Sequence, residues 1–238
     1  MVCRFCGKRS DFVDSHVIPR SFFAPLKAGS NPPLLVTDRV GVLPKRSPIG
    51  EYDKEILCKE CEPKFGEWDS YGKTVLVDLI KTATLIHESG ELVAYRLSGV
   101  DIPKFRMFFI SVLWRASVSM LEFSRLIKLG PFDAKARALI EARNPGGVNE
   151  FSVILSKWDN DWVPLTSNPY MIKMDGVNTA VLEMMDYKAY IKVDKRPVPN
   201  DMIQYALGAE SDICIFSRRF ADSRERRVIA NLAPNFWK

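Results

Sequence analysis

Apolar residues recur at helical spacing over three stretches of the chain, and these stretches predict its helices. The first is residues 62–84, where large apolar side chains fall near the i, i+3, i+4 positions of one helix face. The second, residues 103–129, is apolar on nearly all sides and predicts a central core helix, with Asp101 as its N-cap and Gly130 at its end. A third helix is expected over residues 132–143.

Short apolar runs bounded by turn residues predict strands. One such run lies before the central helix, at residues 92–97. The other runs are residues 151–155, 170–174, 179–184 and 187–193. The turn Asp175-Gly176 favours a hairpin between two of them. A short basic helix is expected at residues 222–232.

The two kinds of pattern together predict the α+β fold class. Residues 1–75 are rich in Cys, Pro, Gly and charge and lack long-range periodicity, which is typical of a small module stapled by a metal. Residues 76–238 are expected to form a helical core with an antiparallel sheet. Because no clear linker separates the two parts, the sequence leaves open whether they pack as one unit.

Composition and charge are those of an ordinary folded protein that is mildly basic. Of the 238 residues, 47% are hydrophobic and 26% are charged, so a core of normal size is expected and disorder is not. The formal net charge of +5 is compatible with a polyanion partner but does not require one.

No segment predicts a membrane span or a secretory signal. The longest charge-free run of the central helix is the eight residues from Met107 to Trp114, whereas a bilayer requires about 20. The N-terminal residues 1–12 lack the apolar stretch of a signal peptide. We therefore expect a cytoplasmic protein without a membrane partner.

Four of the five cysteines form two Cys-x-x-Cys pairs, Cys3/Cys6 and Cys58/Cys61. In an intracellular chain two such pairs indicate a metal site rather than disulfides, and four thiolates suit tetrahedral Zn²⁺. A site of this kind has no open coordination position and is therefore structural. The alternative is four reduced thiols that are neighbours by chance. Cys214 stands alone in an apolar run and is expected in a buried strand.

The sequence around the cysteine pairs resembles one nuclease family. Residues 14–19 read Asp-Ser-His-Val-Ile-Pro, and residues 57–61 read Leu-Cys-Lys-Glu-Cys. A zinc knuckle followed by this His and Pro, and then by a Leu-Cys-x-x-Cys junction, resembles the HNH (ββα-metal) endonuclease family. Asp53 stands where the family often has Asn, and Glu62 stands where a His normally binds the catalytic metal. The resemblance covers residues 1 to about 70 and implies a zinc-stapled ββα-metal module.

The resemblance also implies roles for four residues in the hydrolysis of phosphodiester bonds, in DNA rather than RNA. His16 would be the general base, and Asp53 would orient it by accepting its second N–H. Glu62, with Asp14 as a second ligand, would hold Mg²⁺ or Mn²⁺, since carboxylates suit hard cations. HNH modules joined to other domains resemble restriction and phage-defence proteins, so such a setting is implied.

Two departures from the family pattern keep other functions open. Ser15 replaces the acidic residue before the His, and Glu62 replaces the family's second His. Because strand alternation turns Asp14 and His16 away from Ser15, Asp14 could compensate only if the backbone bends. The alternatives are a catalytically inactive, zinc-dependent nucleic-acid-binding module and a protein-interaction module, in which His16 would be structural. A homodimer or a protein partner also stays open.

Basic residues near the motif are candidate phosphate contacts. They are Lys8, Arg9, Arg20, Lys45 and Arg46, with a second group at Arg218, Arg219 and residues 224–227. Neutralising phosphate charge is how nucleic-acid binders gain affinity, although a solvated surface is the commoner explanation for each group taken alone.

The remaining polar candidates predict structure rather than chemistry. His87 is expected at a helix end or in a turn, and Glu67 and Asp69 are expected in solvent. Arg115 interrupts the apolar central helix, either as a buried paired arginine or at the edge of a polar face, and no function is assigned to it.

Overall fold

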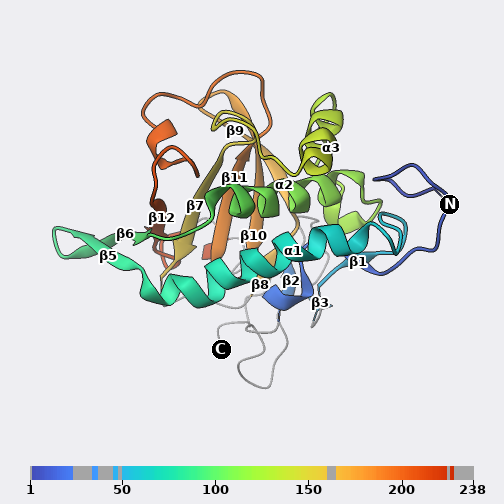
Figure 1. Ribbon diagram of the computed structural model, residues 1–238. Helices are drawn as coiled ribbons and strands as arrows, with labels where there is room; N and C mark the ends of the chain where they lie inside the picture. Colours follow the sequence, from blue (N-terminus) through green and yellow to red (C-terminus); the bar gives the residue numbers. More distant parts are fainter. Residues whose placement is uncertain are drawn as a thin grey trace.

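The structure is a computed structural model of the chain, and it confirms the α+β class. It describes residues 2–23, 34–36, 45–47, 50–159, 165–223 and 226–227. Within these residues three α-helices accompany one large sheet and two small ones (Figure 1). The helices are α1 (Glu62–Lys73), α2 (Ile102–Val118) and α3 (Phe132–Ala142).

The large sheet has seven strands, in the order β5-β6-β12-β7-β11-β10-β9. Their bounds are β5 (Thr84–Glu88), β6 (Glu91–Leu97), β7 (Val153–Trp158), β9 (Tyr170–Met174), β10 (Val177–Met184), β11 (Tyr187–Lys192) and β12 (Ile213–Arg218). One small sheet pairs β1 (Ser15–His16) with β4 (Tyr52–Asp53). The other joins β3 (Lys45–Arg46), β2 (Leu34–Val36) and β8 (Leu165–Ser167).

The large sheet is mixed, so the expectation of an antiparallel sheet is corrected. β12 lies between β6 and β7, antiparallel to the first and parallel to the second. The other neighbouring strands of this sheet are antiparallel. The apolar pattern could not reveal the parallel pair, because it reports which face of a strand is buried and not which neighbour it has.

The predicted strands lie close to their expected positions, with two shifted starts, and strand β5 was not predicted. Strand β10 begins at Val177 rather than at Thr179. The run predicted at residues 151–155 begins as β7 at Val153, because Phe151 has φ of 44°, in the left-handed region that a strand excludes. The predicted hairpin turn is confirmed, with Asp175 and Gly176 at φ of 49° and 79° between β9 and β10.

Helix α2 is the centre of the core, and it joins the two halves of the chain. It lies across one face of the large sheet, with α1 alongside it (Figure 1). The rings of Phe5 and Phe65 pack on Trp114 at 5.5 and 5.8 Å between centroids. Buried residues from the cysteine-rich part and from the sheet belong to one hydrophobic cluster. Residues 1–75 and 76–238 therefore share a core.

The central helix is shorter than predicted, and a carboxylate explains where it ends. Asp101 caps its start as expected, accepting a hydrogen bond from the Lys104 N–H at 3.0 Å. The helix stops at Val118 rather than near residue 129, because Ser119 is extended. The carboxylate of Asp53 accepts hydrogen bonds from the Ser119 hydroxyl at 2.8 Å and the Met120 N–H at 3.1 Å. This contact with Asp53 of β4 directs the chain out of helix α2.

Three smaller predictions, for residues 62–84, His87 and Cys214, agree with the structure only in part or not at all. The run predicted at residues 62–84 is helical as far as Thr82, but it changes from α to π at Thr74 and to 3₁₀ at Leu79. His87 lies in strand β5, not at a helix end. Cys214 is in strand β12 as expected, but it is only half-buried. The helix predicted at residues 222–232 falls mostly outside the described residues.

Candidate functional site

The four paired cysteines converge on one point, from two turns that are far apart in the sequence. Their sulfur atoms all lie within 4.8 Å of one another, and the sulfurs of Cys6 and Cys58 are 3.9 Å apart. Tetrahedral zinc with Zn–S bonds of about 2.3 Å implies sulfur separations of about 3.8 Å. The cluster could therefore hold a metal ion. Among the described residues, no other three Cys, His, Asp or Glu side chains come this close together.

Local backbone contacts preorganise the thiols. The N–H of Cys58 donates to the sulfur of Cys3 at 3.4 Å, and the N–H groups of Cys61 and Glu62 both donate to the Cys58 carbonyl. Burial alone would raise the pKa of the Cys58 thiol, but hydrogen bonds from the thiol and N–H of Cys61 lower it to about 7. The pKa of its neighbour Cys61 is instead raised, by burial and by hydrogen bonds with Cys58 and Cys6, and a bound metal ion would require both thiols to lose their protons.

His16 lies next to this cluster, in a strand–strand–helix arrangement. β1 pairs with β4, which places His16 opposite Tyr52, and α1 starts at Glu62 directly after the last cysteine. The ring of Tyr52 is 5.6 Å from the imidazole. The Nε2 atom of His16 is buried and has no hydrogen-bond partner among the described residues. This nitrogen is therefore a buried polar atom without a hydrogen bond, which a bound ligand or water would supply.

The two departures from the family pattern contact each other. Ser15 is fully buried, and its hydroxyl donates a hydrogen bond of 2.7 Å to Oε2 of Glu62. Burial raises the pKa of Glu62, although this hydrogen bond and the nearby charge of Arg115 oppose the shift. Glu62 is thus a carboxylate that the fold hydrogen-bonds to the motif strand through Ser15.

Asp53 does not have the role that the resemblance implied. Its carboxylate accepts hydrogen bonds from Ser119, Met120 and the N–H of Glu55, and none from His16. The reason is the register of the strand pair, which sets Asp53 opposite Ser15 rather than opposite His16. Asp53 terminates helix α2 and does not orient the imidazole.

Asp14 does not join Glu62 either. Its side chain is 58% exposed and lies 3.9 Å from the Lys54 ammonium. Asp14 therefore faces solvent beside the strand. The structure therefore separates the four residues that the resemblance grouped. His16 and Glu62 remain at the motif, whereas the carboxylates of Asp14 and Asp53 make their contacts elsewhere.

Arg115 and Asp69, to which the sequence assigned no role, complete the surroundings of His16, which we call the His16 corner. Arg115 of α2 is fully buried, and its guanidinium donates to the His16 carbonyl at 2.9 Å. It also forms a two-point ion pair with Asp69 of α1, at 2.6 and 2.9 Å. Asp69 is therefore not a solvated side chain, in contrast to Glu67, which is exposed and bridges Lys104 and Arg143.

The charges around His16 favour its neutral form. Burial lowers its pKa below 6.5, and the positive charges of Arg115 and Arg20 lower it further, against Asp14 and Asp69. Arg20 is exposed, so a phosphate could reach it. A neutral imidazole beside an exposed arginine can accept a proton near a bound anion.

An open hollow of about 540 Å³ borders the site on its β4 side. Residues 50–55 line it on one side, and Met120, which is 77% exposed, lines it on the other. Tyr52 belongs both to this wall and to the packing around His16. A chain-like substrate could therefore lie along β4, with Tyr52 between it and His16, which does not itself line the hollow.

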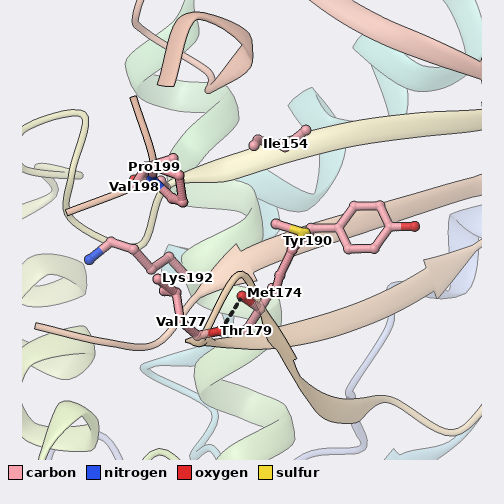
Figure 2. Close-up of a pocket in the computed structure, with 9 residues that line it drawn as sticks. Ile154, Met174, Val177, Thr179, Tyr190, Lys192, Val198 and Pro199 are labelled. Atoms are coloured by element: carbon pink, nitrogen blue, oxygen red, sulfur yellow. Dashed lines mark hydrogen bonds between the residues drawn. The ribbon is translucent and has the colours of Figure 1, made fainter. Parts of the chain in front are cut away.

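A second cavity lies on the face of the sheet opposite to α2 and is too small for a substrate. Its volume is about 20 Å³, which holds about one water molecule. Figure 2 shows its mostly apolar lining, with the Lys192 amine directed away from the cavity. That amine donates to the carbonyls of Asp194 and Arg196 at 2.6 and 2.7 Å. We assign no ligand to this cavity.

The other predicted phosphate contacts divide by position. Lys8 and Arg9 are exposed beside the cysteine cluster. Arg219 is paired with Glu91 and Asp222, and Arg218 stacks on Trp158 at 4.0 Å from the ring centroid. The remaining members are Arg46, Arg226 and Arg227, which are exposed, and the side chains of Lys45 and Arg224, which lie outside the described part.

Comparison of the chain with protein-family models, with curated proteins and with solved structures finds no significant match. Within the described part of the chain, no helix has the length and apolar character that crossing a membrane requires. The interpretation of the site therefore depends on its own geometry.

Proposed function

We propose that the chain is a metal-dependent endonuclease of the HNH type, which hydrolyses phosphodiester bonds in DNA. One observation carries the proposal: Ser15, the neighbour of His16 on β1, donates a hydrogen bond to Glu62 at the start of α1, directly after the last residue of the four-cysteine cluster. This is the strand–strand–helix order that the resemblance implied. A restriction or phage-defence setting would suit such an activity.

In this proposal the cysteine cluster holds a structural zinc ion. Four thiolates at near-tetrahedral spacing fill the zinc coordination shell, which leaves no position for water or substrate. The ion would fix the turns that carry Cys58 and Cys61, and with them the start of α1. Its contribution is to the position of Glu62 and not to the chemistry.

The residues at the motif also fit a hard divalent cation. Mg²⁺ commonly binds through one or two carboxylates and completes its shell with water and substrate phosphates. Glu62 offers the carboxylate, whereas Asp69 is held by Arg115 and Asp14 faces solvent. Glu62 would hold the cation, Mg²⁺ or Mn²⁺, which supplies charge neutralisation at the scissile phosphate.

The chain's own residues then act on the water and the phosphate. His16 is neutral near pH 7 because its pKa is lowered, and its unpartnered Nε2 accepts the proton of the attacking water. Arg20 is exposed beside it and contacts a phosphate oxygen. The hollow along β4 receives the strand on one side of the scissile bond.

One observation favours a second function, which is nucleic-acid binding without catalysis. Ser15 and Glu62 satisfy each other, and no third ligand stands close to them among the described residues. A site of this kind could hold DNA through Arg20, Lys8 and Arg9 and never cut it. Binding that weakens steeply with salt, without cleavage, identifies this case.

The deciding experiment is cleavage of plasmid DNA and of single-stranded DNA by zinc-loaded protein, with Mg²⁺, Mn²⁺ or EDTA. The proposal expects cutting that depends on the divalent ion and is lost in His16→Ala. Folded, zinc-loaded protein that cuts neither substrate with either ion overturns it, and a salt-dependence assay of DNA binding then tests the second function.

A further inference from the structure

We propose that Arg115 is a positioning residue for the His16 site, and that through it helix α2 sets where the imidazole stands. The inference rests on the proposed function in so far as His16 is the base, but its structural half can be tested without cleavage.

The guanidinium of Arg115, on α2, links this helix to both β1 and α1. Its Nη1 donates both to the His16 carbonyl and to Oδ2 of Asp69, each at 2.9 Å, and its Nη2 donates to Oδ1 of Asp69 at 2.6 Å. The guanidinium also lies 5.6 Å from the Phe65 ring centroid. Strand β1 is only two residues long, so pairing with β4 alone leaves it little restrained. Ser15 ties this strand to α1, and the bond to the His16 carbonyl ties it to α2.

Only a guanidinium can make this set of contacts. The planar fork binds a carboxylate at two points and still has an N–H left for a carbonyl, whereas a lysine ammonium is a single point charge. The fork therefore fixes an angle and a distance between α1, α2 and β1. Glu62 and Asp69 are both on α1, so the same fork relates His16 to the element that carries Glu62.

Stability alone is a weak reason for this ion pair. Burying an arginine costs desolvation, and well-packed apolar residues of similar volume usually stabilise a core as well or better. What a buried, fully bonded pair does supply is a defined geometry. Here the geometry it defines is that of the backbone carrying His16.

Helix α2 offers a matched comparison in a second buried arginine. Arg106 is 5% exposed, and its guanidinium donates to the carbonyls of Pro145, Gly146, Gly147 and Glu150. It therefore secures the loop after α3 and makes no contact with the motif. The two arginines share a helix, a depth of burial and a dependence on hydrogen bonds, but only Arg115 touches the His16 strand.

The test compares Arg115→Lys with Arg106→Lys in the full-length, zinc-loaded protein. The readouts are the NMR signals of the His16 ring, the zinc content and the cleavage kinetics. The chain has two histidines, so His87→Gln assigns the ring signals without ambiguity. Asp69→Asn is the second variant, because it loosens the fork from its other end while leaving Arg115 in place.

We expect Arg115→Lys and Asp69→Asn to shift or broaden the His16 ring signals and to lower kcat by about 100-fold, with KM less affected, since a misplaced catalytic group loses rate at that scale. Arg106→Lys should leave the ring signals in place, although it also removes buried hydrogen bonds. Unchanged ring signals in Arg115→Lys, or an equal change in Arg106→Lys, overturns the inference. If the wild-type protein cuts no DNA, the nuclease proposal fails, while the ring signals still decide whether Arg115 positions His16.

Discussion

The cysteine cluster and the His16 corner are neighbours, yet they are built in opposite ways. The cluster consists of four identical ligands in two short turns, and backbone hydrogen bonds within residues 3–62 place every sulfur. The His16 corner has one imidazole, one carboxylate and one hydroxyl, and its backbone is attached to Arg115, about 100 residues away in sequence. The first site has all its ligands within residues 3–61, whereas the second also depends on the packing of helix α2.

The largest effect is expected when one sulfur is removed from the cysteine cluster. Cys58→Ser should abolish zinc binding and prevent residues 2–61 from folding stably. The reason is that structural zinc sites contribute on the order of 10 kcal/mol, comparable to the stability of a whole domain. Zinc content by mass spectrometry and thermal unfolding measure the effect. Cys214→Ser is the control, with an expected cost of about 1 kcal/mol or less. Full zinc content in Cys58→Ser contradicts the four-thiolate site.

Removing the imidazole should separate function from folding. His16→Ala should lower cleavage by about 10²–10⁴-fold, the usual range for a general base, while zinc content and the unfolding temperature stay near those of the wild type. His87→Ala, in the exposed strand β5, should cut normally. Equal loss of cleavage in the two variants would mean that His16 has no special role.

Glu62 tests whether the second site holds a cation. Glu62→Gln keeps the size of the side chain and can still accept the Ser15 hydrogen bond, but it removes the negative charge. We expect the divalent-ion concentration for half-maximal cleavage to rise by about tenfold or more. Glu60→Gln, at an exposed position two residues earlier, is the control. An unchanged metal requirement in Glu62→Gln would exclude Glu62 as a ligand.

The smallest expected effect is on the acid side of the pH profile. Because the pKa of His16 is lowered below 6.5, the imidazole stays neutral as the pH falls through 6.5 and is protonated only at lower pH. Cleavage should therefore hold its rate to about pH 6.5 and then fall about tenfold per unit below the pKa of the base. The measurement is kcat/KM from pH 5 to 8. A decline that starts above pH 6.5 would exclude His16 as the base.

The sequence predicted what depends on spacing and missed what depends on packing. The Cys-x-x-Cys pairs specified the metal cluster, and periodicity placed α2, α3 and most strands. Asp53 was assigned to His16 because it stands where the resembling family often has Asn, whereas the strand register points it at the end of α2. Arg115 had no assigned function, because no pattern indicates which carbonyl a buried guanidinium will bind. Its one signal was a charge inside an apolar helix, which requires a partner.

Strand β12 has a consequence for how the protein is made. Among the strands that the structure describes it is the last in sequence, yet it occupies an inner position that joins β5–β6 to β7–β11–β10–β9. Until residues 213–218 emerge, the nascent chain carries two separate half-sheets, with unpaired hydrogen-bonding edges on β6 and β7. A message cut short before this strand would yield a product prone to aggregation, even though the whole cysteine cluster had already been synthesised.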